Sequence, residues 1–460
     1  MLESLEVTGY AAKGKSLTHH DGKVIFIEGG AVPGDIIDVK LFRNKKDWAE
    51  GRVLRFYSHS EDRIIPFCKH FDWCGGCKWQ MLPYEKQVAY KQQEVIDHLT
   101  RIGKLELPEI NPIIGADKTR NYRNKLEFTF SNKAYLSREE IETTGWDRRD
   151  AVGFHVPRMF DKVLDIEQCH LQEDPSNQIR NEVRRFALEK GYAFYDLREH
   201  TGWLRNLIIR NSTLGEVMVN LCVRTREENQ LEEMLKHLKA SFPEITSLFF
   251  TINGKKNDSI QDLEPELYSG TGYIQEKLGD YIFKIGPKSF FQTNSYQANV
   301  LYGIIKDFAD LKGEETIYDL YCGTGSIGIY LSDKVKKIVG VELIEESIEH
   351  AKENARINKV NNAAFFVGDV IAVCDDAFFE ENGRPDMIVC DPPRAGMHKK
   401  LVRKLLEIEA PRIVYVSCNP ATQARDLIDL SEKYLIKKVQ PVDMFPHTHH
   451  IENVVLLEKK

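Results

Sequence analysis

One cysteine stands at the end of a run of residues that favours a β-strand. Residues 413–417 are apolar or strand-forming, Cys418 follows them directly, and Asn419-Pro420 then stops the strand. The carboxyl ends of strands in an open α/β sheet face the crevice that binds ligands, so Cys418 is a candidate nucleophile. The alternative is a small buried thiol, since free cysteine is among the most often buried residues.

Three other cysteines have the spacing of metal ligands. Cys68, Cys74 and Cys77 form the pattern C-x5-C-x2-C, and the two glycines before Cys77 let the backbone approach an ion closely. Cys169 is the natural fourth ligand. Zinc and an iron–sulfur cluster both fit three thiolates and a distant fourth, so the sequence predicts a metal site of either kind.

A glycine-rich turn follows the predicted strand at residues 316–320. Gly323, Gly325 and Gly328 match the dinucleotide pattern G-x-G-x-x-G, and Glu342 lies at a fitting distance to hold a ribose. The pattern alone is weak, and an NAD-dependent dehydrogenase is a rival interpretation.

Further acidic residues favour S-adenosylmethionine over NAD. Asp319 precedes the first glycine at the position where methyltransferases place an acid, and Asp369 follows the third strand, where it could accept from an adenine amino group. The sequence Asp391-Pro392-Pro393-Arg394 forms a rigid corner beside the expected position of a sulfonium methyl. Methyltransferases that act on exocyclic amines usually have an aromatic residue after this corner, and the RNA 5-methylcytosine enzymes have a cysteine. Because Arg394 stands there instead, Cys418 is left as the nucleophile.

The chain that positions these residues should contain several domains, because 460 residues are too many for one ordinary core. Residues 1–58 read as short strands between glycine turns, which predicts a five-stranded barrel of the OB type. Residues 59–285 predict a mixed α+β domain that begins with a helix from residue 83 to about residue 105. Residues 286–460 alternate strands and helices, which predicts a parallel sheet with helices on both faces.

Composition limits the partners. The formal charge of −7 argues against a broadly basic surface, so a nucleic-acid site must be a local patch. One candidate is a predicted strand that places Arg123 and Lys125 on one face and Tyr122 on the other, although a solvated charged strand explains it equally well. We see neither a membrane-spanning apolar run nor a signal peptide, and expect a cytoplasmic protein.

Together these motifs resemble the RNA 5-methyluridine methyltransferase family, and within it the bacterial 23S rRNA branch. The resemblance covers nearly the whole chain and includes residues 289–294, Ser-Phe-Phe-Gln-Thr-Asn, and residues 450–454, His-Ile-Glu-Asn-Val. The tRNA branch is similar over the C-terminal part and is expected to lack the barrel and the cysteine set.

The resemblance implies a Rossmann-like class I methyltransferase domain, an N-terminal TRAM barrel, and a central domain carrying a [4Fe–4S] cluster. It implies Cys68, Cys74, Cys77 and Cys169 as cluster ligands, Cys418 as the nucleophile and Glu452 as the base. The family's S-adenosylmethionine contacts match Gln292, Tyr321, Glu342 and Asp391, and the motifs add Asp319, Gly323 and Asp369.

The expected reaction is methylation at C5 of a uridine in 23S rRNA by a monomer, through a covalent bond between cysteine and C6. A uridine in tRNA, or two sites in rRNA, are alternatives. A noncatalytic RNA-binding assembly factor is a hypothesis from a different class.

Overall fold

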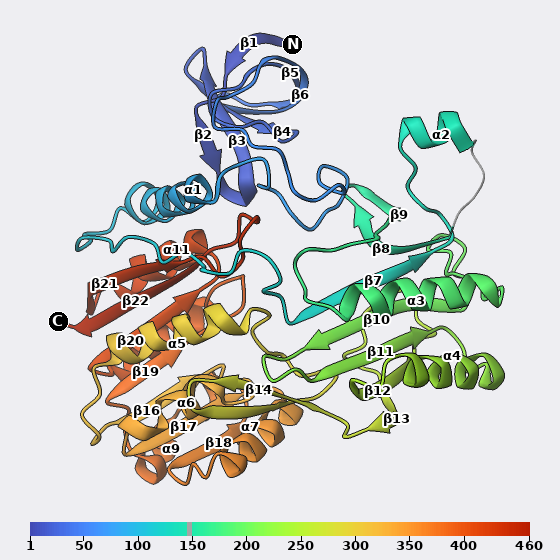
Figure 1. Ribbon diagram of the computed structural model, residues 1–460. Helices are drawn as coiled ribbons and strands as arrows, with labels where there is room; N and C mark the ends of the chain where they lie inside the picture. Colours follow the sequence, from blue (N-terminus) through green and yellow to red (C-terminus); the bar gives the residue numbers. More distant parts are fainter. Residues whose placement is uncertain (145–149) are drawn as a thin grey trace. The chain divides into compact units, whose positions relative to one another are not determined.

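The computed structural model describes residues 1–144 and 150–460 (Figure 1). It consists of two compact units, each described by itself. The first contains Met1–Phe67, Cys77–Thr119 and Gln297–Lys460, and the second contains Cys68–Gly76 and Arg120–Tyr296. The units therefore divide the chain differently from the three predicted segments.

The N-terminal strands form one curled sheet in the first unit. Their order is β1-β5-β6-β4-β3-β2, and alternate residues such as Ile25, Ile27, Ile37 and Val39 fill a shared core. The sheet has six strands instead of the predicted five, because the three-residue strand β2 extends the edge beside β3. The strands are β1 (Leu2–Glu6), β2 (Gly9–Ala11), β3 (Lys15–His20), β4 (Lys23–Glu28), β5 (Ile36–Asn44) and β6 (Trp48–Ser58).

The C-terminal part of the first unit is a seven-stranded sheet with the order β18-β17-β16-β19-β20-β22-β21. The first five strands are parallel, as the sequence predicts, whereas β22 runs antiparallel to both β20 and β21. The strands are β16 (Thr316–Leu320), β17 (Lys337–Glu342), β18 (Ala363–Val367), β19 (Met387–Cys390), β20 (Arg412–Ser417), β21 (Tyr434–Val442) and β22 (Glu452–Lys459).

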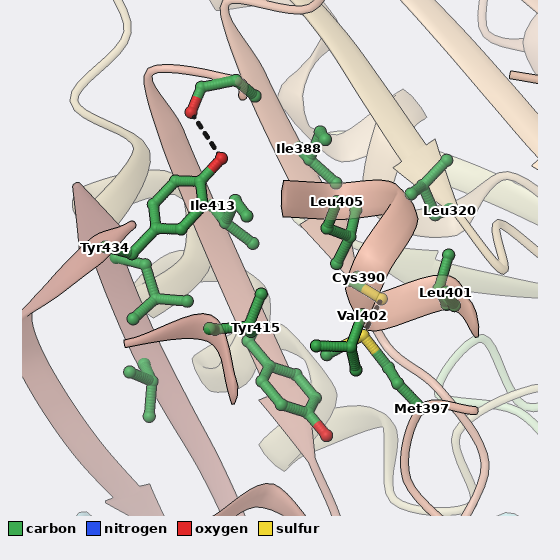
Figure 2. Close-up of a cluster of buried hydrophobic side chains, with 14 of the residues drawn as sticks. Leu320, Ile388, Cys390, Met397, Leu401, Val402, Leu405, Ile413, Tyr415 and Tyr434 are labelled. Atoms are coloured by element: carbon green, nitrogen blue, oxygen red, sulfur yellow. Dashed lines mark hydrogen bonds between the residues drawn. The ribbon is translucent and has the colours of Figure 1, made fainter. Parts of the chain in front are cut away.

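Alternation along β16 separates the two faces of this sheet. Leu320 belongs to the core that α10 covers, whereas the neighbouring side chain of Asp319 reaches a residue of α6. Figure 2 shows the α10 side, where Leu401 and Leu405 approach the strands. The helices are α5 (Ser295–Ala309), α6 (Ser326–Leu331), α7 (Glu345–Ile357), α8 (Val370–Val373), α9 (Asp376–Asn382), α10 (Lys399–Ile408) and α11 (Pro420–Leu430).

Helix α1 (Tyr84–Asp97) belongs to the first unit although the sequence assigns it to the central domain. It continues into a π-helical turn, His98–Ile102, so the predicted helix is confirmed. Val95 of α1 and Leu99 of the turn are fully buried in the core of the C-terminal seven-stranded sheet. This burial explains why the segment joins that unit.

The second unit is a mixed sheet with the order β13-β12-β11-β10-β7-β8-β9, and helices α3 and α4 supply much of its core. Strand β7 begins at Lys125, so Arg123 precedes the predicted strand instead of sharing a face with Lys125, and Tyr122 is buried. The elements are β7 (Lys125–Ser131), α2 (Arg138–Thr144), β8 (Ala151–Val156), β9 (Met159–Asp165), α3 (Ser176–Glu189), β10 (Leu204–Asn211), β11 (Val217–Val223), α4 (Glu228–Ser241), β12 (Ile245–Ile252), β13 (Glu266–Gly270), β14 (Ile274–Leu278) and β15 (Tyr281–Ile285).

None of the helices in residues 1–144 and 150–460 combines the length and the apolar character needed to cross a membrane.

Candidate active site

A pocket of about 400 Å³ opens at the carboxyl ends of β16, β17 and β18. This volume lies in the range of small-molecule sites, and the position is where open α/β sheets bind ligands. Three predicted cofactor residues, Tyr321, Glu342 and Asp369, line it. The other lining residues belong to no recognisable motif, so the sequence did not indicate them. They are Val341, Leu343, Gly368, Val370, Ile371, His398 and Lys400.

The glycine turn beside this pocket is held by two carboxylates. The backbone N–H of Gly328 donates to Asp319 Oδ2 at 2.9 Å, and that of Gly323 donates to Glu342 Oε2 at 3.2 Å. Gly325 has φ 76°, and a Cβ there would lie 2.9 Å from the ring of Phe365. The turn therefore requires glycine for both its backbone conformation and its close packing.

Asp319 supports the turn from inside the sheet. It is buried, and it is not among the residues that line the pocket. Burial raises its pKa to about 7, and the nearby charges of Asp391 and Glu342 act in the same direction. Gln292 belongs to the second unit, where its carbonyl accepts from Asn124 at 2.8 Å.

The pairing of β20 with β22 brings the predicted nucleophile and base together. Ser417 lies opposite Asn453 in this antiparallel pair, so Cys418 and Glu452 follow as neighbours at the end of the sheet. Gln423 of α11 fixes that junction, because its Nε2 donates to the carbonyls of Tyr415 and Asn453, both at 3.1 Å.

The Asp391-Pro392-Pro393-Arg394 corner is tied to the same junction. Asn419 caps α11 and donates from Nδ2 to the carbonyl of Arg394 at 3.1 Å. Asp426 of α11 accepts from Met397 N and from the hydroxyl of Tyr415, each at 2.8 Å. Asp426 thus holds the segment that follows the corner against β20, but a single acid in a helix gives no signal in the sequence.

Burial controls the charges at this junction. It raises the pKa of Cys418 to about 11, aided by Glu452 and Asp391, while Arg394 acts in the opposite direction by its charge and by a hydrogen bond. Burial also raises the pKa of Asp391 to about 7 and that of Glu452 well above its usual range. A thiol, two carboxyl groups and a guanidinium therefore interact at one end of the sheet, which suits nucleophilic and proton-transfer chemistry.

A loop of residues 443–451 precedes Glu452, and α1 holds it in place. Lys91 and Asp443 are fully buried, with Lys91 Nζ 2.6 Å from Asp443 Oδ1. Gln87 Oε1 accepts from the backbone N–H of His447 at 2.9 Å. Neither interaction is visible in the sequence, because 352 positions separate Lys91 from Asp443.

The predicted metal ligands do not themselves form a metal-binding group. Within residues 1–144 and 150–460, no set of three or more His, Cys, Asp or Glu side chains is arranged to hold a metal ion. Cys68, Cys74 and Cys169 lie in the second unit, and Cys77 begins a segment of the first. Cys68 is close enough to Cys169 to contribute to the raised pKa of that thiol, for which burial is the main cause.

Comparison with known proteins agrees with this geometry. The family model described as tRNA (Uracil-5-)-methyltransferase matches residues 198–368 and 381–460. The chain belongs to this family. It is an S-adenosylmethionine-dependent RNA uracil-5-methyltransferase.

Similar proteins cover the whole length of the chain. An uncharacterized RNA methyltransferase of Bacteroides thetaiotaomicron is 52% identical, with 97% of this chain and 99% of the relative covered. One of Porphyromonas gingivalis is 46% identical, with 98% and 99% covered.

A solved structure also matches beyond the catalytic sheet. The tRNA (uracil-54, C5)-methyltransferase of Pyrococcus abyssi, in complex with S-adenosyl-L-homocysteine, has a TM-score of 0.75 and 28% identity. The match covers 98% of this chain and 100% of that one. Because the match covers nearly all of this chain, it is not limited to the C-terminal part where a likeness to tRNA enzymes was expected.

Proposed function

We propose that this protein methylates C5 of a uridine in 23S rRNA through a covalent bond between Cys418 and C6 of the uracil. The observation that carries the proposal is the β20–β22 register, which makes Cys418 and Glu452 neighbours beside the Asp391–Arg394 corner. We expect the protein to act as a monomer in the cytoplasm.

The proposed reaction has four steps: addition of the cysteine, methyl transfer, proton removal and elimination of the cysteine. C5 of uracil is a poor nucleophile, so the Cys418 thiolate first adds to C6 and leaves an enolate whose C5 takes the methyl group. S-adenosylmethionine is the methyl donor and leaves as S-adenosylhomocysteine. The Glu452 carboxylate then removes the C5 proton, and the thiolate departs from C6 to restore the ring. Arg394 favours the thiolate by its charge. The uridine must leave its stack to reach these groups.

The pocket supports the assignment of the methyl donor. Its lining combines the carboxyl groups of Glu342 and Asp369 with the ring of Tyr321, which suits a nucleoside carrying an amino acid chain. We assign Asp391 to the reacting end of the donor because it follows β19, the strand beside β16 in the sheet. Gly323 and Asp319 act on the donor through the turn. Gln292 remains a predicted contact.

A transcript that contains 5-fluorouridine tests the covalent step. Fluorine cannot leave C5 as a cation, so the adduct should persist and migrate as a protein–RNA complex in a denaturing gel. The Cys418→Ala variant should form no adduct, whereas Cys374→Ala, which changes another buried cysteine, should form it normally.

Glu452→Gln should accumulate adduct on ordinary RNA and turn over about 10²- to 10⁴-fold more slowly. Wild-type turnover by Cys418→Ala would refute the mechanism.

The RNA target has two candidates. The motif resemblance supports 23S rRNA, while the full-length match to a tRNA (uracil-54, C5)-methyltransferase favours a uridine in tRNA. Both RNAs, purified from a strain without the gene, should be incubated with the protein and a methyl-labelled donor. Label in 23S rRNA with none in tRNA would support the first, and the reverse would establish the second.

We also propose that Cys68, Cys74, Cys77 and Cys169 bind a [4Fe–4S] cluster. Arg180 supports an anionic group near Cys169, because its guanidinium is buried, its Nε has no hydrogen-bond partner, and its charge lowers the pKa of that thiol. The reaction contains no redox step, so the cluster would stabilise the fold or position RNA.

Purification without oxygen tests the cluster. The protein should be brown and contain about four iron atoms and four sulfides per chain, the content of a [4Fe–4S] cluster. Cys169→Ser should lose the colour, whereas Cys222→Ser should keep it, because Cys222 is buried elsewhere in the second unit. Colourless protein with one zinc would refute the cluster and leave the methyltransferase proposal intact.

A further inference from the structure

A loop of the N-terminal barrel packs against the segment that leads to Glu452. Residues Ala12–Gly14 join β2 to β3, and Lys13 and Gly14 both adopt left-handed backbone conformations, with φ 66° and φ 67°. A Cβ on Gly14 would lie 3.0 Å from Cβ of His449. The barrel loop therefore touches a residue three positions before the predicted base.

The segment that follows the Cys77 position reaches the same place. The backbone N–H groups of Lys78 and Trp79 both donate to the carbonyl of His447, at 2.8 and 3.1 Å. Tyr10 of the barrel packs on Trp79, with ring centroids 5.0 Å apart. The barrel, this segment and the loop before Glu452 thus meet around His449.

Four cations lie near the half-buried ring of His449. Burial lowers its pKa to about 4, and the charges of Lys78, Lys91, Arg394 and Lys13 act in the same direction. Lys91 is buried and paired with Asp443, whereas Lys13, Lys78 and Arg394 are exposed. The imidazole is therefore neutral at physiological pH, and the surrounding charge remains available to an anion.

Lys13 and Lys78 are not neutralised by ion pairs with the described residues. Lys15, two residues after Lys13, pairs with Glu28 and Glu50. Neither Lys13 nor Lys78 forms an ion pair within the described part of the chain. The two exposed lysines lie near the same imidazole, so an anion bound there would be attracted by both charges.

We propose that Lys13 and Lys78 bind a backbone phosphate of the RNA beside the target uridine, at the entrance to the Cys418 site. The proposal rests on the proposed function, since Arg394 links the two places: its charge acts on both His449 and Cys418. A uridine turned out of its stack carries its own phosphates to the rim of the pocket. Ammonium groups suit this ligand because they act as point charges toward phosphate oxygens.

Salt dependence of RNA binding separates a phosphate contact from a structural role. The test uses the full-length protein and a fluorescent oligouridylate, with the dissociation constant measured over a series of KCl concentrations. Each phosphate contact on a single strand contributes about 0.7 to the slope of log K against log salt. The double variant Lys13→Ala/Lys78→Ala should lower that slope by about 0.7 and weaken binding about tenfold at 0.1 M KCl.

Two further variants control for charge and for folding. Lys334→Ala/Lys336→Ala removes the same charge next to the amino end of β17, and should leave the slope unchanged. Lys13→Arg/Lys78→Arg keeps both charges and should retain the slope. With the intact substrate, the alanine pair should raise KM about tenfold at nearly constant kcat and leave S-adenosylmethionine binding unchanged.

An unchanged slope in the alanine pair would overturn the phosphate site, and so would an equal loss in the Lys334/Lys336 pair. Failure of the proposed function gives a different result. Absence of a Cys418 adduct on fluorinated RNA would refute the covalent mechanism, whereas the salt slope of oligouridylate binding would still report the lysines.

Discussion

The buried pair of Lys91 and Asp443 should decide how firmly the proposed base, Glu452, is held. Both side chains are fully buried, and Lys91 Nζ also donates to the carbonyl of Phe445 at 3.2 Å. Asp443 accepts from the hydroxyl of Tyr84 and, through its backbone carbonyl, from Gln297, both at 2.8 Å. Asp443 therefore connects two helices to the loop before Glu452: its carboxylate contacts α1 and its backbone carbonyl contacts α5.

Lys91→Met keeps the length of the side chain and removes its charge. Asp443 would retain its neutral donors but lose its cation, and removing one partner of a buried pair costs about 3–5 kcal/mol. For units of this size we expect the thermal midpoint to fall by about 10 °C. Lys91→Met/Asp443→Asn removes both charges and should recover more than half of the loss, because the amide still accepts from Tyr84.

The functional readout distinguishes positioning from stability. If the loop sets the position of Glu452, proton removal should slow more than cysteine addition, so the variant should accumulate adduct on ordinary RNA well below its midpoint. Gel analysis of quenched single-turnover reactions measures this. A loss of less than about 1 kcal/mol would refute the energetic argument, and a lower midpoint with no excess adduct would refute the positioning argument.

Three further perturbations test the pocket and its supports. Burial raises the pKa of Asp319 to about 7, so a contribution of up to about 4 kcal/mol to the free energy of unfolding is fully present below about pH 4 and is lost progressively as the pH rises to about 7. The thermal midpoint of the ligand-free protein should therefore fall as the pH rises from about 4 to about 7, and Asp319→Asn should flatten the profile. Gly325→Ala should destabilise the turn by about 1–3 kcal/mol and weaken S-adenosylmethionine binding in calorimetry. The control is Gly313→Ala: Gly313 also has a positive φ, 98°, but a Cβ there would meet no other atom, so this variant measures the backbone strain alone. Asp426→Asn should slow methyl transfer about tenfold with unchanged donor affinity, and the exposed Asp429→Asn should not.

Features that act within a few consecutive residues were predictable from the sequence. The strand before Cys418 and the glycine turn at Gly323 are read from local patterns, because backbone conformation and strand propensity depend on neighbours in the chain. The five parallel strands are confirmed for the same reason. Asp319 illustrates the limit of this approach: its position is conspicuous in the sequence, but its hydrogen bond to the Gly328 amide is a property of the folded turn.

Features that depend on distant pairing could not be predicted from the residues alone. Glu452 and Glu458 are both acids of the last strand, and only the pairing of β22 with β20 makes one a neighbour of Cys418. Helix α1 has a periodic apolar face, but nothing in that face indicates that the catalytic sheet will bury it. Lys91 would be expected on a surface, since an isolated lysine is almost never buried without a partner.

The positive charge of the methyl donor should change the proton affinity of Glu452 during the reaction. In the ligand-free protein, burial and Asp391 raise the pKa of Glu452 well above its usual range, which favours the protonated carboxyl group. A sulfonium bound beside Asp391, as we propose, would favour the ionised carboxylates, and methyl transfer would then remove that charge. The proton affinity of Glu452 would rise when the C5 proton must leave. Binding of S-adenosylmethionine should therefore release more protons near pH 7 than binding of S-adenosylhomocysteine. Titration calorimetry in buffers of different ionisation enthalpy counts these protons, and equal release by the two ligands would contradict the argument.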